Sequence, residues 1–185
     1  MKNILLSKRY ATALFDLSIS GKQLDQVHAD MKLVAATLAE NRELRKLMTN
    51  PVVPPSKKKT VIRSIFENHV QPLTLAFMDI LIRKGREQEI AMIAEHFGQM
   101  YLDYNNIAVV ELETATPLPE ALEQKISGLI SAQTNKKINI SGSVDKELIG
   151  GFVLRMGDYQ YDASIRRVIK RLHDDFDKNL FIKEF

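Results

Sequence analysis

The stretch Ile149–Ser164, "IGGFVLRMGDYQYDAS", decides how the second half of this chain is interpreted. The chain has only eight glycines, yet two of them, Gly150 and Gly151, are adjacent at the start of an apolar run. Glycine weakens a strand, so a pair at its start indicates a bulge, a positive φ or the close approach of another backbone. The order of residue types therefore predicts a turn that leads into a strand.

A second turn and a helix cap follow within the same stretch. Gly157 and Asp158 separate two short apolar runs, which predicts a hairpin turn because glycine tolerates the φ values of such turns. Asp162 or Ser164 is then expected to cap a final helix, since either side chain offers an oxygen to the free amides of the first turn. We interpret the stretch as strand, turn, strand and capped helix.

Phosphate binding is the alternative interpretation of a glycine pair near a helix start. Here the glycines precede a strand, and the chain contains no GxxxxGK[ST] segment. The context therefore favours a structural role over a phosphate site.

Residues 106–185 alternate between strand and helix patterns. The β-branched segments "IAVVELETA" (107–115) and "KKINISGSV" (136–144) are typical of strands. Between them, residues 117–134 predict a helix whose buried face is expected to contain Leu122, Ile126, Leu129 and Ile130. The last helix, from residue 164, carries one apolar stripe: Ile165, Val168, Ile169, Leu172 and Phe176. We expect a small α/β domain with a short mixed sheet and a C-terminal helix.

The first 105 residues show only helical periodicity. Six segments are predicted to be helices: 4–20, 24–40, 42–48, 57–69, 72–85 and 87–104. Ser56 is expected to cap the fourth, and Pro72 and Gly85 to begin and close the fifth. The predicted fold class is therefore α plus α/β, a six-helix bundle over residues 1–105 followed by a smaller α/β domain over residues 106–185.

Two of the predicted helices have more apolar surface than one core needs. The first has a stripe of Leu5, Ala11, Phe15 and Ile19 and another of Leu6, Tyr10, Ala13 and Leu17. The fifth is apolar nearly all round, and one of its rows contains Leu73, Phe77, Ile80 and Lys84. Two neighbouring helices with spare apolar faces form a groove for a third amphipathic helix. The alternative is that these residues only fill the bundle core.

The composition excludes several classes of site. The chain has no cysteine, so it has no disulfide, thiolate nucleophile or cysteine-based zinc site. The net charge is +3, and neither half is basic enough to indicate nucleic-acid binding. We expect neither a signal peptide nor a membrane span, since no apolar run approaches about 20 residues.

No set of residues has the spacing of a catalytic, cofactor or metal site. The four histidines fall on four different predicted helices, without the i, i+4 pair of a zinc motif: His28, His69, His96 and His173. A triad of Ser164, His173 and Asp162 is possible on paper, but Ser164 is better explained as a cap. Lys57–Lys59 are interpreted as an exposed patch.

Three segments carry a resemblance to a known family. Residues 145–172, "DKELIGGFVLRMGDYQYDASIRRVIKRL", resemble the C-terminal signature of the δ subunit of bacterial F-type ATP synthase, the counterpart of the mitochondrial oligomycin-sensitivity-conferring protein. Residues 9–18, "RYATALFDLS", and 81–90, "LIRKGREQEI", resemble its first helix and the end of its fifth. The resemblance spans nearly the whole chain and departs at Ala163 and Arg167, where the family usually has glycine.

The resemblance implies a non-catalytic stator subunit, present in a single copy, which links the catalytic head to the membrane-anchored b subunits. It implies that the helical domain binds the N-terminal segments of the α subunits, and the candidate residues are Leu6, Tyr10, Ala13, Leu17, Phe77, Ile80 and Lys84. It implies that the α/β domain binds the b C-terminus, with structural or stator-binding candidates Gly150, Gly151, Arg155, Gly157, Asp158, Asp162 and Ser164. The implied location is peripheral, on the cytoplasmic face of the bacterial inner membrane, with no cofactor and no direct membrane insertion.

The alternative is an RNA-binding helical bundle of the antitermination type. Lys57–Lys59 and Arg63 would then be the binding patch. Such binding weakens steeply with salt, whereas binding in an apolar groove does not.

Overall fold

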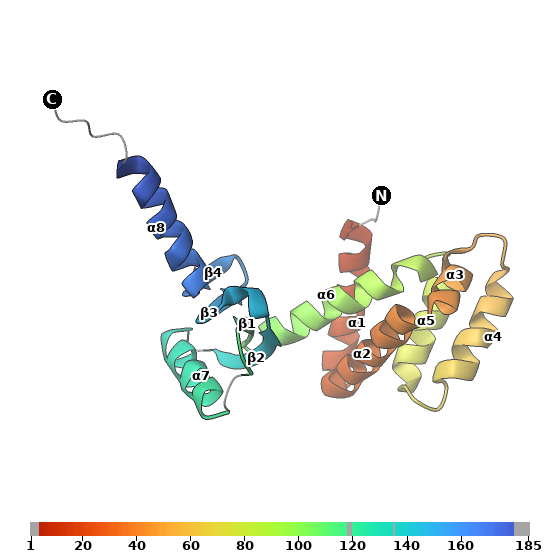
Figure 1. Ribbon diagram of the computed structural model, residues 1–185. Coiled ribbons are helices and arrows are strands. Elements are labelled where there is room, and N and C mark those ends of the chain that lie inside the picture. The colour runs from red at the N-terminus through yellow and green to blue at the C-terminus, as the bar shows by residue number, and fades with distance from the viewer. Residues whose placement is uncertain (1–3, 118–119, 135, 180–185) are drawn as a thin grey trace. The chain divides into compact units, whose positions relative to one another are not determined.

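The computed structural model describes residues 4–117, 120–134 and 136–179. The chain divides into two compact units, residues 1–105 and residues 106–185. The first unit is helical and the second combines a sheet with helices (Figure 1). Each unit has buried apolar residues of its own.

The helices of the first unit share one hydrophobic core. Their bounds are α1 Ile4–Ser20, α2 Leu24–Glu40, α3 Arg42–Thr49, α4 Pro55–Phe66, α5 Pro72–Arg83 and α6 Ile90–Tyr104, with a short 3-10 turn, η1, at Glu87–Glu89. Among the largest fully buried side chains are Leu14, Met31, Ile62, Phe66, Met78 and Phe97. Most of these helices therefore contribute at least one large side chain to the same core.

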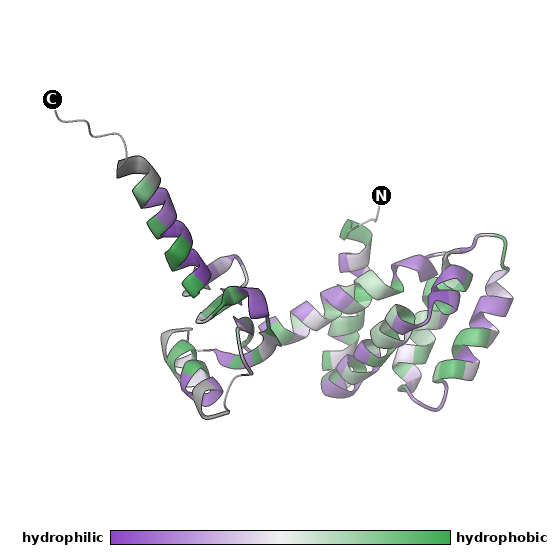
Figure 2. Ribbon diagram, in the orientation of Figure 1, coloured by the Kyte–Doolittle hydropathy of each residue, from purple (hydrophilic) through white to green (hydrophobic). Residues whose placement is uncertain are grey.

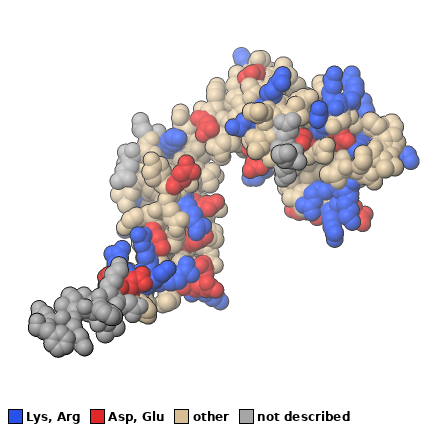
Figure 3. Space-filling view, turned by 90° about the horizontal axis from the view of Figure 1, so that it is seen from above, with Lys and Arg blue, Asp and Glu red and all other residues tan. Residues whose placement is uncertain are grey.

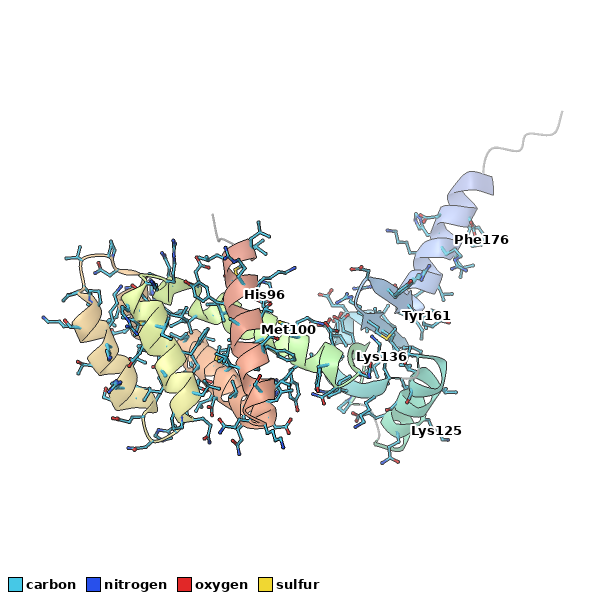
Figure 4. All side chains as sticks on the ribbon, turned by 180° about the vertical axis from the view of Figure 1, so that it is seen from behind. His96, Met100, Lys125, Lys136, Tyr161 and Phe176 are labelled. Carbon is cyan, nitrogen blue, oxygen red and sulfur yellow. The ribbon has the colours of Figure 1, made fainter. Side chains whose placement is uncertain are left out.

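Helix α1 packs against α6 through a narrow face. Its buried residues are Ser7, Ala11, Leu14, Phe15 and Ser18. Met100 of α6 lies beside α1, with its sulfur 3.9 Å from the Thr12 hydroxyl oxygen (Figure 4). Leu5 and Ile19, which the pattern placed on a stripe with Ala11 and Phe15, are 76% and 37% exposed. The buried row of α1 therefore includes two serines, Ser7 and Ser18.

Helix α5 has well-defined ends. Pro72 occupies its first turn, as predicted. Gly85 has a φ of 66°, and the amide of Arg86 donates to the carbonyl of Leu81 at 2.8 Å, which closes the helix in a Schellman motif. At the other end, Asp30 of α2 anchors the start of α5, because its Oδ2 accepts from the amide of the N-cap residue Gln71 at 2.8 Å and from the Thr74 hydroxyl at 2.7 Å.

Helix α4 corrects two expectations. It begins at Pro55, so Ser56 lies inside the first turn and is not the N-cap. Lys58 is only 3% exposed, because its position on α4 faces the end of α3 and η1. Its Nζ donates to the Met48 carbonyl at 2.9 Å and pairs with Glu87. Lys57–Lys59 are therefore not a continuous exposed patch.

The second unit is built on a four-stranded mixed sheet. Its elements are β1 Ile107–Thr114, α7 Glu120–Thr134, β2 Lys137–Val144, a 3-10 turn η2 Lys146–Leu148, β3 Phe152–Met156, β4 Tyr159–Asp162 and α8 Ile165–Asn179. The strand order is β2-β1-β3-β4. Strand β1 pairs parallel with β2 and antiparallel with β3, which also pairs antiparallel with β4. The buried apolar residues are Val110, Leu112, Leu148 and Val153.

Helix α7 connects the parallel strands β1 and β2, as a parallel pair requires. On its predicted buried face, Ile126 and Ile130 are half-buried. Leu129 is 69% exposed, so its assignment to this face was wrong. The side chain of Leu122 lies outside the described residues.

Candidate functional site

The first candidate surface combines residues of α1 and α5, and we call it the α1–α5 surface. Its members are Leu6, Tyr10, Ala13 and Leu17 of α1 and Phe77, Ile80 and Lys84 of α5. Leu17 is 55% exposed, Ile80 is 41% exposed, and Ala13 and Lys84 are also exposed. Leu6 and Tyr10 are half-buried, and Phe77 belongs to the core. The surface therefore has exposed apolar side chains on both helices.

An aromatic contact joins the two helices of this surface. The ring centroids of Tyr10 and Phe77 lie 6.5 Å apart with an interplanar angle of 68°, an edge-to-face arrangement. The Ser7 hydroxyl donates to Glu89, just beyond α5, at 3.1 Å. Exposed residues of both helices therefore lie near the contact between the half-buried Tyr10 and the buried Phe77.

The second candidate set surrounds the start of α8. The Ser164 side chain is 1% exposed and accepts from the Arg167 amide at 3.2 Å, so Ser164 is the N-cap. Asp162 accepts from the Ser164 amide at 2.9 Å, and hydrogen bonds from the Ser164 side chain and amide lower the pKa of Asp162. Ser164 therefore caps α8 directly, and Asp162 supports the cap through its hydrogen bond with Ser164.

Gly150 and Gly151 pack directly against this cap. Gly151 has a φ of 79°, and a Cβ at this position would lie 2.2 Å from the carbonyl oxygen of Ala163. The Ile165 amide donates to the Gly150 carbonyl at 3.0 Å. Of the three explanations left open by the sequence, the structure shows a positive φ and a close backbone approach at the same residue.

The remaining three candidates lie along the β3–β4 hairpin. Gly157 has a φ of 56° in the two-residue turn and Asp158 is exposed beside it. Arg155 of β3 donates to Glu113 of β1 at 2.8 Å. The structure thus brings Gly150, Gly151, Asp162 and Ser164 together at the start of α8 and leaves the other three apart from them.

The apolar stripe predicted for the last helix is exposed in the structure. We call it the α8 stripe: Ile165, Val168, Ile169, Leu172 and Phe176 are 45%, 55%, 51%, 53% and 68% exposed. Figure 2 shows hydrophobic and hydrophilic residues on different sides of α8, and Figure 4 labels Phe176 near its end. The regular spacing was the signal for this surface, because it indicated one apolar face.

Two kinds of site are absent from the described parts of the chain. Within residues 4–117, 120–134 and 136–179, no cluster of three or more His, Asp or Glu residues is arranged to hold a metal ion. Over the same ranges, no helix is both long and apolar enough to cross a bilayer.

The comparison with family models decides the assignment. The model described as "ATP synthase delta (OSCP) subunit" matches residues 6–176. The chain belongs to this family. A δ subunit from Christiangramia forsetii is 30% identical over 184 residues and covers 100% of both chains. One from Salinibacter ruber is 32% identical over 174 residues, covering 94% of this chain and 92% of the relative.

A solved structure shares the fold of this δ/OSCP chain. It is a chain of the Toxoplasma gondii mitochondrial ATP synthase hexamer, determined by cryo-EM, with a TM-score of 0.71 and 24% identity. The match covers 92% of this chain and 97% of the other. The protein is thus a subunit of ATP synthase and a non-catalytic component of its peripheral stalk. The RNA-binding alternative finds no support in these comparisons.

Proposed function

We propose that this δ/OSCP subunit ties the catalytic head of ATP synthase to the membrane-anchored b subunits, so that rotation is coupled to ATP synthesis. A six-helix bundle over residues 1–105 binds the N-terminal segments of the α subunits, and the α/β domain over residues 106–185 binds the b C-terminus. The subunit acts as a single copy on the cytoplasmic face of the bacterial inner membrane, without inserting into it. A connector that resists torque needs affinity rather than reactive groups.

The observation that carries the proposal is the α1–α5 surface. Ala13 and Leu17 on one helix and Ile80 on the other remain exposed beside the Tyr10–Phe77 contact. Exposed apolar side chains on two adjacent helices suit an amphipathic partner helix, which contributes its own apolar row. Ala13 is small, so a partner backbone can approach α1 closely there.

The test is the substitution Ala13→Arg in the full chain. A long charged side chain at this position obstructs the partner helix, so the affinity for a peptide of the α N-terminus is expected to fall by at least about 2 kcal/mol. Titration calorimetry measures the affinity, and circular dichroism checks that the helices remain folded.

Ala36→Arg is the matched control, because Ala36 is an exposed alanine on α2, outside the α1–α5 surface. It should leave the affinity within experimental error of the parent chain. Equal affinities for the Ala13 variant and the parent, in folded protein, would remove α1 from the α-binding site.

A further inference from the structure

Strand β2 lies at one edge of the sheet and pairs with β1 on one side. The Lys137 amide donates to the Asn106 carbonyl at 2.8 Å, and the Asp145 amide donates to the Thr114 carbonyl at 2.9 Å. Odd-numbered residues of β2 therefore turn their backbone groups toward β1, and even-numbered residues turn theirs away, because these directions alternate along a strand. The outward-facing residues are Ile138, Ile140, Gly142 and Val144.

The outer side of β2 is open to another strand. Within the described parts of the second unit, no segment pairs with this side. A row of unpaired amides and carbonyls is a template for strand addition, and edge strands are commonly shielded by proline, charge or short length. Strand β2 spans eight residues, contains no proline and carries no charge from Ile138 to Val144. Its length and composition therefore leave the edge available.

A cleft accompanies this edge. Helix α7 packs on the edge strand β2 more than on the central strand β1, and Figure 1 shows α7 beside β2. Between α7 and β2 lies a cleft of about 560 Å³. Its described lining residues come from these two elements: Glu123, Gln124, Ser127, Gly128, Ser131, Ile138, Asn139 and Ile140. The space thus lies where side chains of an added strand would point.

Small residues on α7 keep the cleft open. A Cβ at Gly128 would meet no atom within 4 Å, and Ser127 and Ser131 are the next small residues on the same side of the helix. The Ser131 hydroxyl donates to the Lys136 carbonyl at 2.9 Å, which ties the end of α7 to the start of β2. Every second side chain of an added strand would face α7. The space and its hydroxyl groups suit small, β-branched or hydroxyl side chains.

The charges around the cleft differ between its two ends. Lys136 and Lys137 are exposed at the start of β2, and Glu123 lines the cleft from the first half of α7. An acidic residue of a partner is therefore favoured at the lysine end. Figure 3 shows acidic and basic side chains mixed on the visible side of the second unit, whereas a nucleic-acid backbone favours a continuous basic surface.

We propose that the outer edge of β2 and the cleft beside α7 together bind one extended segment of a partner protein, which adds to the sheet as a further strand. Main-chain hydrogen bonds supply affinity, and alternate small or β-branched side chains enter the cleft. An acidic residue of the partner lies beside Lys136 and Lys137. A helix does not fit this site, because its own backbone groups are already paired. Neither the α1–α5 surface nor the start of α8 includes this edge, so strand addition is separate from the contacts proposed above.

The first experiment titrates a synthetic peptide into the full chain and follows amide hydrogen exchange by NMR. The peptide has about seven residues, with alternating threonine and valine between a terminal aspartate and a terminal lysine, and a second peptide reverses the two charged ends. Exchange of the outward amides of Ile138, Ile140 and Gly142 is expected to slow at least about tenfold. The Asn139 and Ser141 amides face β1 and should change less.

A peptide with proline at its centre is the matched control, because it lacks one amide and cannot complete the ladder. It should leave the exchange of the outward amides unchanged. If neither charged peptide slows this exchange at concentrations up to about 1 mM, the proposal is overturned.

The second experiment fills the cleft by Gly128→Phe. The open space at Gly128 accommodates the ring, and phenylalanine favours a helix more than glycine does, so the midpoint of thermal unfolding should not fall. Peptide affinity, measured by calorimetry, is expected to drop at least about tenfold. Leu129→Phe is the control, because Leu129 is 69% exposed on another side of α7 and its replacement should change affinity less than about twofold.

The third experiment removes one outward amide by Gly142→Pro. No hydrogen bond to β1 is lost, because the Gly142 amide points away from that strand, and proline is tolerated on the free side of edge strands. Peptide affinity should fall at least about fivefold, whereas Gly142→Ala keeps the amide and should bind within about twofold of the parent.

The last experiment reverses the charge of one of two lysines labelled in Figure 4. Lys136→Glu is expected to weaken peptide binding about threefold at low salt. Lys125→Glu makes the same change on α7 outside the cleft lining and should have less than about half that effect.

Two further outcomes would contradict the proposed strand addition. If Gly128→Phe and Gly142→Pro both bind the peptide as the parent does, the peptide binds elsewhere. If sedimentation shows a dimer of the parent that Gly142→Pro dissolves, a second copy of this chain occupies the edge in place of a partner segment.

Discussion

Asp30 of α2 contacts the start of α5, a helix that is far from it in the sequence. It is 7% exposed and accepts from the amide of Gln71, the N-cap residue of α5, 41 positions later in the chain. Asp30→Ala is expected to lower the free energy of unfolding by about 1–3 kcal/mol, because the Gln71 amide and the Thr74 hydroxyl lose their acceptor. Urea unfolding followed by circular dichroism measures the change.

Asp25→Ala on the same helix is the matched control. Asp25 is exposed and accepts a hydrogen bond from the Tyr101 hydroxyl at 2.8 Å. Because this contact is exposed, its loss should change the unfolding free energy by less than about 0.5 kcal/mol. Similar losses for both variants would contradict a special role of Asp30 at the start of α5.

Gly151 combines two constraints that glycine alone satisfies. Gly151→Ala introduces a Cβ 2.2 Å from the backbone oxygen of Ala163 at a φ of 79°, and backbone cannot move aside as a side chain does. We expect a loss of at least about 3 kcal/mol, with α8 separating from η2. Gly157→Ala has a φ of 56° but open space around the added carbon, so it should lose only about 1 kcal/mol.

Comparative thermal unfolding of the two glycine variants checks this prediction. A Gly151 variant as stable as the Gly157 variant would show that the backbone near Ala163 can move away from the added carbon at little cost in free energy. Protection of the α8 amides from hydrogen exchange gives an independent measure of whether the start of α8 remains packed against Gly151.

Single residues were predictable where their role is local. The helix cap near Asp162 and Ser164 depends on positions only a few residues apart, and the structure settled which of the two is the cap. Lys58 could not be predicted to be buried, because its partners belong to α3 and η1. The φ of 64° at Ile149 likewise could not be predicted, because a β-branched residue rarely adopts positive φ.

At the scale of elements, helices α4 and α5 are joined by an ion-pair cluster. Asp79 Oδ2 lies 2.6 Å from the Arg63 guanidinium and 3.0 Å from the Lys59 ammonium. Asp79 is 10% exposed, whereas both cations are almost half exposed. Burial alone would raise the pKa of Asp79, but the hydrogen bonds from Arg63 and Lys59 outweigh it and hold the pKa below its ordinary value.

This lowered pKa predicts how the stability of the helical unit depends on pH. A carboxyl whose pKa is depressed on folding stabilises the protein fully above its unfolded value, about 4, and that contribution is lost as the pH falls through the folded value. Asp79→Asn should therefore be less stable than the parent at pH 7, by about 1–2 kcal/mol, and the difference should shrink below pH about 4.

Urea unfolding at a series of pH values between 7 and 3 measures this difference. Asp103→Asn is the control, because Asp103 is exposed on α6 and its contact is with Gln99 of the same helix. A difference between the Asp79 variant and the parent that is constant over the whole range would exclude the ionised carboxyl as its cause.

Most elements could be predicted from periodicity. The alternating segment from residue 107 predicted β1, and the apolar rows predicted α2 and α6. Errors occurred where a face was assigned: α7 leaves Leu129 exposed and α1 buries two serines. Periodicity identifies an apolar row, but the neighbouring element decides whether that row is covered.

At the scale of the whole molecule, the two units have separate buried residues. Residues 1–105 contain one helical core, and residues 106–185 bury their own apolar side chains around the sheet. Removal of residues 164–185 should therefore abolish capture of the b segment while the α N-terminal peptide still binds. Pull-down with each partner in parallel checks both halves of this expectation.

A shortened chain ending at residue 105 should bind the α peptide with the affinity of the full chain, because its core is complete. Capture of b by the chain that lacks residues 164–185 would place the b contact outside α8. Loss of α binding in the same chain would mean that the helical unit depends on the rest of the molecule.

The presence of two different structural classes was visible in the sequence, since the apolar period changes near residue 106. The order of the strands within the sheet was not. Strand β1 lies between β2 and β3. Local sequence patterns identify each strand, but they do not show which strands pair with each other.

The parallel pairing of β1 with β2 sets an order of events during synthesis of the chain. The helical unit is complete once residue 105 has left the ribosome. Strand β1 cannot pair with β2 along its whole length until the chain has been made as far as Val144. At about 5–20 residues per second, translation of the 39 residues from position 105 to Val144 takes roughly 2–8 seconds. The helical unit therefore has time to fold before β1 and β2 can pair.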